Sequence, residues 1–319
     1  MVILRLFTAV IILFLSSSTY ARNLSIYFID VGQGDAEYIE LPNGKNALID
    51  GGPSSAVTSN LANFLTNHSI TTIDYVVLTH PHDDHYKGLN YVFDNCQVNN
   101  FYDTKMNNSG ATGDETMRTK ATSEPGCSIS YPSAGDTLSW DTNVTVKVLN
   151  ACPNTTSSSN GETINNNSIV LKVTYNQVSI LFTGDIQSTT ESSLVTTYGD
   201  TLQANILKVP HHGSQYSSTT DFLNKVKPKK AYIEVGTNSY GHPTTEAITR
   251  LQNTGATVYR TDQSGTLTYS TDGSTDITPD TTKDIKAGDY VKPATIHFGS
   301  TAPIKKKIQE LKDYKDALK

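Results

Sequence analysis

The sequence is poor in cysteine and lacks the cysteine spacings that hold metals or redox centres. Cys96, Cys127 and Cys152 lie in one stretch of the chain, and none of them forms a C-x-x-C pair. This excludes the C-x-x-C type of metal or redox site. In an oxidising compartment two of the three could form a disulfide and leave one thiol over. All three could equally be packed or exposed thiols, and the sequence does not choose a pairing.

Long apolar runs are missing except at the N-terminus. Arg5 precedes an apolar run from Leu6 to Leu15, and small residues lead up to Ala21, which is typical of a secretory signal. A retained membrane anchor has the same pattern, but this run is short for a bilayer-spanning helix. We therefore expect residues 1–21 to be cleaved and the remaining chain to be exported, to the periplasm or the extracellular medium, with no stable membrane insertion.

A basic charge excess is missing as well. The formal net charge is −6, and cleavage after Ala21 would remove Arg5 and make the charge one unit more negative, −7. A mildly acidic protein does not offer a broad electrostatic surface to nucleic acid. Bound divalent metal ions would nevertheless make their own site far more positive than the side chains indicate, so a locally positive cleft is still allowed.

The hydrophobic pattern predicts an α+β protein. Hydrophobic residues occupy 36% of the 319 positions, enough for one large core or two modest ones. Helical spacing predicts helices at 56–66, 190–198 and 219–225, and the Asn-, Thr-, Ser- and Gly-rich residues 101–131 indicate long loops. Apolar runs bounded by turns predict strands, beginning with a β-meander, at 24–29, 37–41, 46–50, 73–78, 144–149, 169–175, 178–182, 206–209 and 230–235. This order suits a two-sheet sandwich flanked by helices.

The C-terminal part differs in composition from the rest. Residues 271–288 are rich in Thr, Asp and Gly and are expected to be irregular, whereas 304–319 places apolar residues at helical spacing and carries six lysines against three acids. We expect one domain over residues 22–278, followed by a tail over 279–319 with a terminal helix. A solvated helix that packs one apolar stripe is favoured over a membrane or partner role.

The candidate chemistry is concentrated directly after the predicted strand 73–78. His80, His82, Asp84 and His85 fall within six positions and include three of the eight histidines in the chain. Residues i and i+2 of an extended backbone project to the same side, so His80 and His82 can bind one metal ion together while Asp84 and His85 reach a second. Imidazole and carboxylate are ligands of Zn²⁺ and similar divalent metals. The run therefore predicts a metal site rather than a polar turn.

The run THPHDDH at 79–85 resembles the H-x-H-x-D-H signature of the metallo-β-lactamase superfamily. The opening stretches IDVGQGD at 29–35 and LIDGG at 48–52 are similar to the soluble domain of ComEC-type competence proteins. Further similarities follow in the order of that family, at 165–171 (NNNSIVL), 181–185 (LFTGD), 207–214 (LKVPHHGS) and 240–243 (YGHP). The resemblance covers about residues 24–269. It implies an αββα four-layer sandwich with the metal site in the cleft between the sheet edges.

The resemblance also implies roles for single residues. Asp185 would bridge two metal ions, and Asp50 would brace a metal-binding histidine, although support of a turn is an equal alternative for Asp50. One of His211 and His212 would complete the shell of the second metal, and the sequence does not decide which. The other would face the substrate as an acid or a phosphate contact, a role for which His242 is a further candidate.

One departure from the pattern concerns the first metal ion. The wider superfamily usually has another histidine before the bridging aspartate, but no histidine occurs here from Tyr86 to Pro210. ComEC-type domains are similar in this gap, where the present chain has Asn165. The first ion would then be held by His80, His82 and Asp185, with Asn165 or water. We expect one or two Zn²⁺ ions, with Mn²⁺ as the alternative, while His68 and His297 match no motif and are expected to be surface or packing residues.

The function that the resemblance implies is that of an exported metal-dependent hydrolase, in the first place a phosphodiesterase or nuclease. A metal-activated hydroxide would attack, Asp84 would orient it, and a histidine such as His212 or His242 would protonate the leaving oxygen. The substrate would be a phosphodiester, with DNA as a candidate. Hydrolysis of an ester, lactone or β-lactam and a non-catalytic binding protein on the same fold are the alternatives. The sequence indicates neither protein partners nor an oligomeric state.

Overall fold

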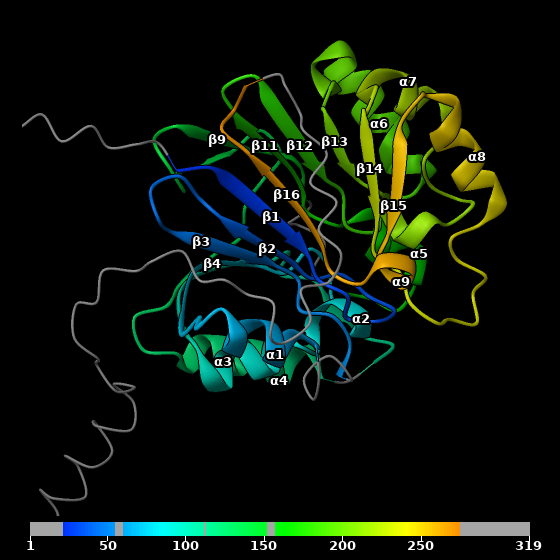
Figure 1. Cartoon of the computed structure of the whole chain (residues 1–319). Helices are drawn as coiled ribbons and strands as arrows, with labels where there is room; N and C mark the ends of the chain where they lie inside the picture. The colour runs from blue at the N-terminus through cyan, green and yellow to red at the C-terminus, as the bar shows by residue number, and fades with distance from the viewer. Residues whose placement is uncertain (1–21, 55–59, 112, 152–156, 275–319) are drawn as a thin grey trace, which may run out of the picture. The chain divides into compact units, whose positions relative to one another are not determined.

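The computed structural model describes residues 22–54, 60–111, 113–151 and 157–274, which form two seven-stranded sheets with helices on their outer sides (Figure 1). The predicted sandwich is thereby confirmed. Within these ranges no helix combines the length and the apolar character needed to cross a membrane. The predicted signal, Cys152, His297 and the tail over 279–319 lie outside the described residues, as do residues 56–59 of the first predicted helix. The predictions made for them stay predictions.

The first sheet joins an antiparallel meander to parallel strands. β1 pairs antiparallel with β16 and β2, and β2 with β3, which confirms the predicted meander, whereas β4 runs parallel to β3 and β5. The strands lie in the order β16 (Leu267–Thr271), β1 (Leu24–Phe28), β2 (Glu37–Glu40), β3 (Asn46–Ile49), β4 (Thr72–Val77), β5 (Gln97–Tyr102) and β7 (Ser128–Ser130).

The second sheet has the same two-part construction. β11 pairs antiparallel with β9 and β12, and β12, β13, β14 and β15 run parallel to one another. The strands lie in the order β15 (Thr257–Arg260), β14 (Lys230–Ile233), β13 (Ile206–Lys208), β12 (Val178–Phe182), β11 (Val170–Tyr175), β9 (Val144–Asn150) and β8 (Thr137–Leu138). A separate parallel pair joins β6 (Asn107–Asn108) to β10 (Ser157–Ser158).

The helices cover the outer face of each sheet. α1, α3 and α4 pack on the first sheet and α6, α7 and α8 on the second (Figure 1), each burying its apolar side. The helices are α1 (Asn60–Asn67), α2 (Asp83–Tyr86), α3 (Leu89–Asn95), α4 (Asp114–Ser123), α5 (Gly161–Asn166), α6 (Ser188–Tyr198), α7 (Thr220–Val226), α8 (Thr245–Asn253) and α9 (Thr261–Ser264), with 3₁₀ turns η2 (Gly199–Leu202) and η3 (Pro210–Gly213).

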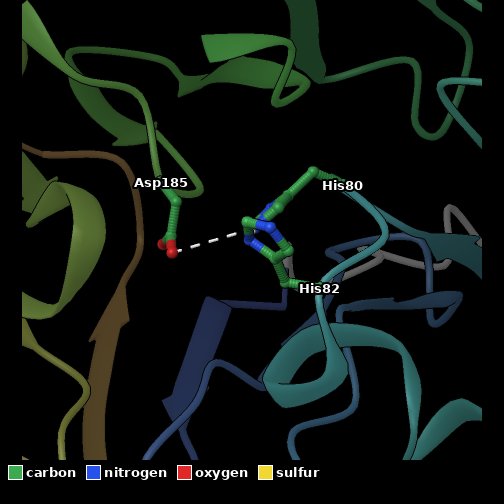
Figure 2. A group of neighbouring side chains, drawn as sticks. All are labelled: His80, His82 and Asp185. Carbon is green, nitrogen blue, oxygen red and sulfur yellow. Dashed lines mark hydrogen bonds and ion pairs between the residues drawn. The ribbon is translucent and has the colours of Figure 1, made fainter. Parts of the chain in front are cut away.

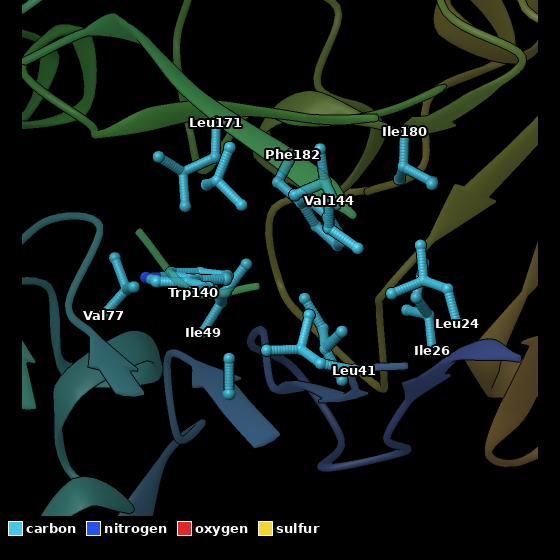
Figure 3. Packing of buried hydrophobic residues seen from close by; sticks show 14 of the residues in the cluster. Leu24, Ile26, Leu41, Ile49, Val77, Trp140, Val144, Leu171, Ile180 and Phe182 are labelled. Carbon is cyan, nitrogen blue, oxygen red and sulfur yellow. The ribbon is translucent and has the colours of Figure 1, made fainter. Parts of the chain in front are cut away.

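Apolar side chains from both sheets fill the space between them (Figure 3). In β1 the burial alternates, with Leu24, Ile26 and Phe28 inside, because successive side chains of a strand point to opposite faces. The Phe28 ring lies 6.5 Å from that of Phe182 in β12 and stacks on Tyr232 in β14 at 4.2 Å. Burial of an aromatic side chain of this size contributes about 1.5–3 kcal/mol. These contacts fix the first strand of the chain against the second sheet.

The prediction of long loops over 101–131 is wrong. This stretch contains the end of β5, the short strand β6, the ten-residue helix α4 and the strand β7. α4 is polar, and only Asp114, Met117 and Ala121 of it are buried. An apolar stripe of two residues is too narrow to be recognised as helical periodicity in the sequence.

The ends of several strands meet at one side of the sandwich. β4 leads into His80, β12 into Asp185, and β13 into His211 and His212. Parallel strands bring their carboxyl ends to the same edge of a sheet, where polar side chains can face a cleft while the core stays dry. The topology therefore gathers residues that lie more than a hundred positions apart in the sequence.

Candidate metal centre

His80 and His82 lie side by side directly after β4. Asp50, at the end of β3, accepts hydrogen bonds from the Thr79 amide (2.8 Å) and the Thr79 hydroxyl (2.6 Å), and this fixes the chain as it leaves the sheet. The Nε2 atom of His80 and the Nδ1 atom of His82 are 3.0 Å apart. Both rings therefore point to one place, and Figure 2 shows the Asp185 carboxylate pointing toward it from the opposite side.

Asp185 comes to the site from the second half of the chain. Its amide donates to the Ser168 hydroxyl at 3.1 Å, which holds the turn after β12. Gly184, with φ +49°, has no room for a side chain, since a Cβ there would lie 2.8 Å from that of Ser168. The Oδ2 atom of Asp185 lies 3.8 Å from Nε2 of His80. His80, His82 and Asp185 form a group whose ligand atoms all lie within 4.8 Å of one another.

A second group consists of Asp84, His85 and His212, again with ligand atoms within 4.8 Å. Asp84 and His85 lie on the short helix α2, and His85 Nδ1 contacts Asp50 Oδ2 at 2.8 Å. Asp50 thus contacts both this histidine and the turn at Thr79, so each of the two roles predicted for it has a matching contact and both stay predictions. His212 Nδ1 donates to the backbone oxygen of Glu234 at 2.8 Å, which leaves its Nε2 directed at the group.

Asp185 lies between the two groups. Its Oδ2 atom is 3.4 Å from Nε2 of His85 and 3.5 Å from Nε2 of His212, besides the contact with His80. Among the described residues, His85 Nε2 and His212 Nε2, which both face this oxygen, are buried without a hydrogen-bond partner. Buried polar atoms are nearly always paired, so atoms of this kind facing one another fit a divalent cation. The residues therefore suit two neighbouring metal ions that share Asp185, and ligation by them stays a prediction.

The structure distinguishes the two histidines of the later pair. Both have left-handed backbone, with φ 52° at His211 and 53° at His212, which is uncommon for residues other than glycine and turns the rings apart. His212 is buried and belongs to the second group, whereas His211 is partly exposed and its Nε2 lies 4.0 Å from Asp185. The geometry favours His212 as the ligand and leaves His211 among the residues that line the cavity.

Four residues of the metal groups, His82, Asp84, Asp185 and His212, form the floor of an open cavity of about 360 Å³. The rings of His211 and His242 are 5.2 Å apart on its wall. Burial, with His211 and His212 nearby, lowers the pKa of His242 to about 4, so this ring is neutral at pH 7. Asn165 also lines the cavity, and its buried Oδ1 has no hydrogen-bond partner in the described part of the chain. Asn165 or water was expected at the first ion, and this amide oxygen belongs to the lining of the same cavity as His82 and Asp185.

Sequence reasoning missed a buried ion pair behind the metal groups. Lys208, fully buried at the end of β13, donates to the Asp35 carboxylate and to the backbone oxygen of Gly184 at 3.1 Å. Asp35 in turn lies 3.2 Å from His212 Nδ1. Glu37 and Glu234, both buried, surround the same lysine. A lysine inside the apolar strand ILKV was the available signal, because an ammonium group is buried only when it is paired.

Electrostatics at the site follow from burying acids and histidines together. Burial alone would raise the pKa of Asp185, but His212 and His85 hold it well below its usual range. Burial alone would lower the pKa of His85, but Asp185 and the other carboxylates raise it well above its usual value. Burial and the neighbouring His85 lower the pKa of His80. Protons on histidine thus balance the carboxylates, and a bound divalent cation would replace those protons.

Comparisons with known proteins agree with this site. ComE operon protein 3 of Bacillus subtilis (strain 168) is 28% identical over 254 residues, which cover 74% of this chain and 32% of that protein. Competence protein ComA of Neisseria gonorrhoeae is 30% identical over 237 residues, which cover 74% of this chain and 30% of that protein. The chain spans about a third of the length of the curated relatives that it matches.

Among solved structures, the diiron β-hydroxylase CmlA of Streptomyces venezuelae matches with a TM-score of 0.49 and 13% identity, covering 78% of this chain and 54% of that one. A diphosphatase of the PhnP family matches with a TM-score of 0.45 and 14% identity, covering 77% and 98%. Scores this low say nothing about chemistry. The sequence profile of the Metallo-beta-lactamase superfamily matches residues 29–236, which include both metal groups. The chain therefore belongs to the metallo-β-lactamase superfamily, whose fold binds one or two divalent metal ions and supports metal-dependent hydrolysis.

Proposed function

We propose that this metal-dependent hydrolase is an exported phosphodiesterase or nuclease. The observation that carries the proposal is the position of Asp185, which lies within 4 Å of histidines from both metal groups. A pair of metal ions that share one carboxylate suits phosphoryl transfer, because both the attacking and the leaving oxygen need charge stabilisation. Zn²⁺ is the ion proposed for these imidazole and carboxylate groups, with Mn²⁺ as the alternative.

Bound divalent ions would supply a water of lowered pKa and neutralise charge on the phosphoryl oxygens. The residues of the chain do the remaining work. Asp84, partly exposed at the cavity floor, is positioned to accept a proton and to orient the attacking water. His211 and His242 face the same space from the wall, where an N–H of either neutral ring can donate a hydrogen bond to a phosphoryl oxygen or to the leaving oxygen. An open cavity gives the substrate direct access to all of these groups.

The names of the relatives support a phosphodiester in DNA as the substrate. Two are competence proteins, and a third, 27% identical over 269 residues, is Recombination protein 2 of Haemophilus influenzae. The part of those proteins that the chain does not match is about two thirds of their length, so their own activities come to this chain only as a proposal. Export is the other part of the proposal, and it depends on the apolar segment before Ala21.

The test combines metal analysis with hydrolysis of bis-p-nitrophenyl phosphate and of linear single- and double-stranded DNA. We expect the natural chain to bind one to two ions and to cleave a phosphodiester. His82→Ala should lower activity at least about a hundredfold, the range found when one essential catalytic group is removed. His68→Ala is the matched control, because His68 packs on Phe64, away from the site, at 4.1 Å between ring centroids. Equal activity of His82→Ala and the natural chain would refute the site, and hydrolysis of a β-lactam but of no phosphodiester would refute the substrate class.

A further inference from the structure

An exposed aromatic ring stands at the mouth of the metal cavity. Within the described ranges, the large hydrophobic side chains that are exposed are Tyr131, Tyr216 and Tyr240, and Tyr240 is the most exposed of them at 72%. Of the three, Tyr240 alone lines the cavity. A single exposed ring is ordinary on a protein surface, but a ring that lines a cavity can contact whatever that cavity binds. Its position makes the substrate the natural partner.

The loop that carries Tyr240 is held in place by one side chain. The Asn238 side-chain oxygen accepts hydrogen bonds from the amides of Tyr240 (3.0 Å) and His242 (3.1 Å). The Asn238 side-chain nitrogen donates to the backbone oxygens of Gly236 (2.9 Å) and His242 (2.8 Å). The Tyr240 and His242 rings are 5.8 Å apart. The backbone of the loop is therefore preorganised and keeps Tyr240 next to the group proposed to contact the leaving oxygen, which lowers the entropy cost of ordering the loop on binding.

The charge of the cavity excludes one common mode of nucleic-acid binding. None of the described residues that line the cavity is a lysine or an arginine. Three of them are acidic: Asp83, Asp84 and Asp185. Proteins that track a nucleic-acid backbone do so with rows of basic side chains. The described part of the lining can hold one phosphodiester on its metal groups, but it offers no cation to the neighbouring phosphates. Recognition beyond the scissile phosphate must then come from uncharged contacts.

The size of the cavity also fits a substrate with one phosphodiester and few further contacts. A volume of about 360 Å³ is near the lower end for small-molecule sites and is too small for a double helix. Amide side chains of Gln33, Asn108 and Asn165 line it together with Tyr240. A flat ring with hydrogen-bonding edges, attached to a phosphodiester, matches an aromatic face with amides around it.

We propose that Tyr240 stacks on the nucleobase next to the scissile phosphodiester, so that the site takes single-stranded nucleotide substrates and selects them by stacking rather than by backbone charge. The inference depends on the proposed phosphodiesterase function. Stacking on an aromatic side chain requires an unpaired base and tolerates every base, because each has a π face. Duplex DNA would be cleaved only where an end or a gap frees a base.

The test uses two substrates with the same leaving group, thymidine 5′-(p-nitrophenyl phosphate) and methyl p-nitrophenyl phosphate. Tyr240→Ala should raise KM for the thymidine ester about 5- to 150-fold, which corresponds to the loss of one stacked base, and leave KM for the methyl ester unchanged. Tyr240→Phe keeps the ring and should stay within about twofold of the natural chain, since stacking does not need the hydroxyl. Tyr216→Ala is the control, because Tyr216 is 61% exposed and does not line the cavity.

The outcomes separate the two proposals. If the natural chain hydrolyses neither ester, the phosphodiesterase function fails and the inference fails with it. If the natural chain hydrolyses both and Tyr240→Ala changes them equally or not at all, only the stacking role is refuted. A KM for a single-stranded oligonucleotide that rises about a thousandfold between roughly 50 and 200 mM salt would also refute it, because that dependence marks several backbone phosphate contacts.

Discussion

Which ring nitrogen of a histidine is available to a metal depends on what its other nitrogen contacts. At His212 the backbone oxygen of Glu234 can only accept, so Nδ1 carries the proton and Nε2 faces the metal groups. At His85 the Nδ1 atom contacts the Asp50 carboxylate in the same way, so Nε2 is again the nitrogen that faces the metal groups. His211 has no comparable brace: its Nδ1 lies 3.4 Å from the Gln187 amide and its Nε2 3.4 Å from the Asn165 amide. The contacts of His212 therefore suit a metal ligand, whereas those of His211 do not fix one ring nitrogen for a metal.

We expect His212→Ala to remove metal and His211→Ala to retain it. Loss of the braced ligand should weaken metal binding at least about 10- to 100-fold, the effect found when even a supporting residue of a metal site is changed. His211→Ala should keep the metal content of the natural chain and lower the rate of phosphodiester cleavage. Metal content after dialysis, measured together with the cleavage rate, checks both variants. The assignment is wrong if His211→Ala is the variant that loses metal.

The buried Lys208 connects the two halves of the centre. Through Asp35 it reaches His212, and through the backbone of Gly184 it reaches Asp185. Burial alone would lower the pKa of Lys208, but Asp35 and Asp185 raise it well above its usual value, so the lysine remains charged. Removing one partner of a buried pair leaves the other charge uncompensated.

Lys208→Met should therefore destabilise the protein by about 3–5 kcal/mol, measured by urea unfolding in the presence of a chelator. Asp35→Asn combined with Lys208→Met should cost clearly less than the sum of the two single changes, because the double variant no longer buries the Asp35 carboxylate without its lysine. Simple additivity of the two changes would show that the pair does not act as a unit.

At the scale of elements, the sequence predicted what apolar runs and turn signals encode. The strands around Val76, Ile180 and Leu207 are apolar runs bounded by turn residues in the sequence. The structure has strands close to the expected residues at all three places. The order of the family motifs located the ligand-bearing turns, and the topology brings them together. The polar helix α4 was missed because its hydrophobic stripe has only two residues. The pairing of Lys208 with Asp35 was missed because it joins residues 173 positions apart, which no local pattern encodes.

Arg118 explains how α4 is held without a wide apolar face. Its guanidinium donates two hydrogen bonds to Asp103, at 2.6 and 3.1 Å, and further ones to Asp114 and Asn107 and to the backbone oxygen of Met106. Asp103 and Asp114 are almost fully buried. The segment between β5 and α4 is therefore tied to the helix by charge and by the planar fork of the guanidinium.

Because a lysine cannot reproduce that fork, Arg118→Lys should lower the free energy of unfolding by about 2–4 kcal/mol although it keeps the charge. Lys87→Ala, which breaks the exposed pair with Asp83, should cost less than about 1 kcal/mol and is the control. Urea unfolding of the three proteins measures both effects. Equal costs for the two variants would mean that the arginine contributes no more than a surface ion pair.

At the scale of the molecule, the candidate metal centre is built from both halves of the sandwich. His80, His82 and Asp84 follow β4 of the first sheet, while Asp185 and His212 follow β12 and β13 of the second. An apolar core already joins the sheets, but at this edge the contacts are between buried carboxylates and histidines. A divalent cation bound there would act as a cross-link that exists only in the folded state, so metal binding must add to the stability of the whole domain.

We therefore expect Zn²⁺ or Mn²⁺ to raise the melting temperature of chelator-treated protein. At a free metal concentration about 100 times Kd the gain is about 2.7 kcal/mol, which corresponds to roughly 5–11 °C for a domain of this size. Differential scanning calorimetry of the natural chain, His68→Ala, His82→Ala and Asp185→Asn would measure it. His68→Ala should show the full rise, His82→Ala a smaller one and Asp185→Asn the smallest, because Asp185 contacts both metal groups. An equal rise in all four would mean that the metal stabilises the fold from some other place, and the shared centre would have to be given up.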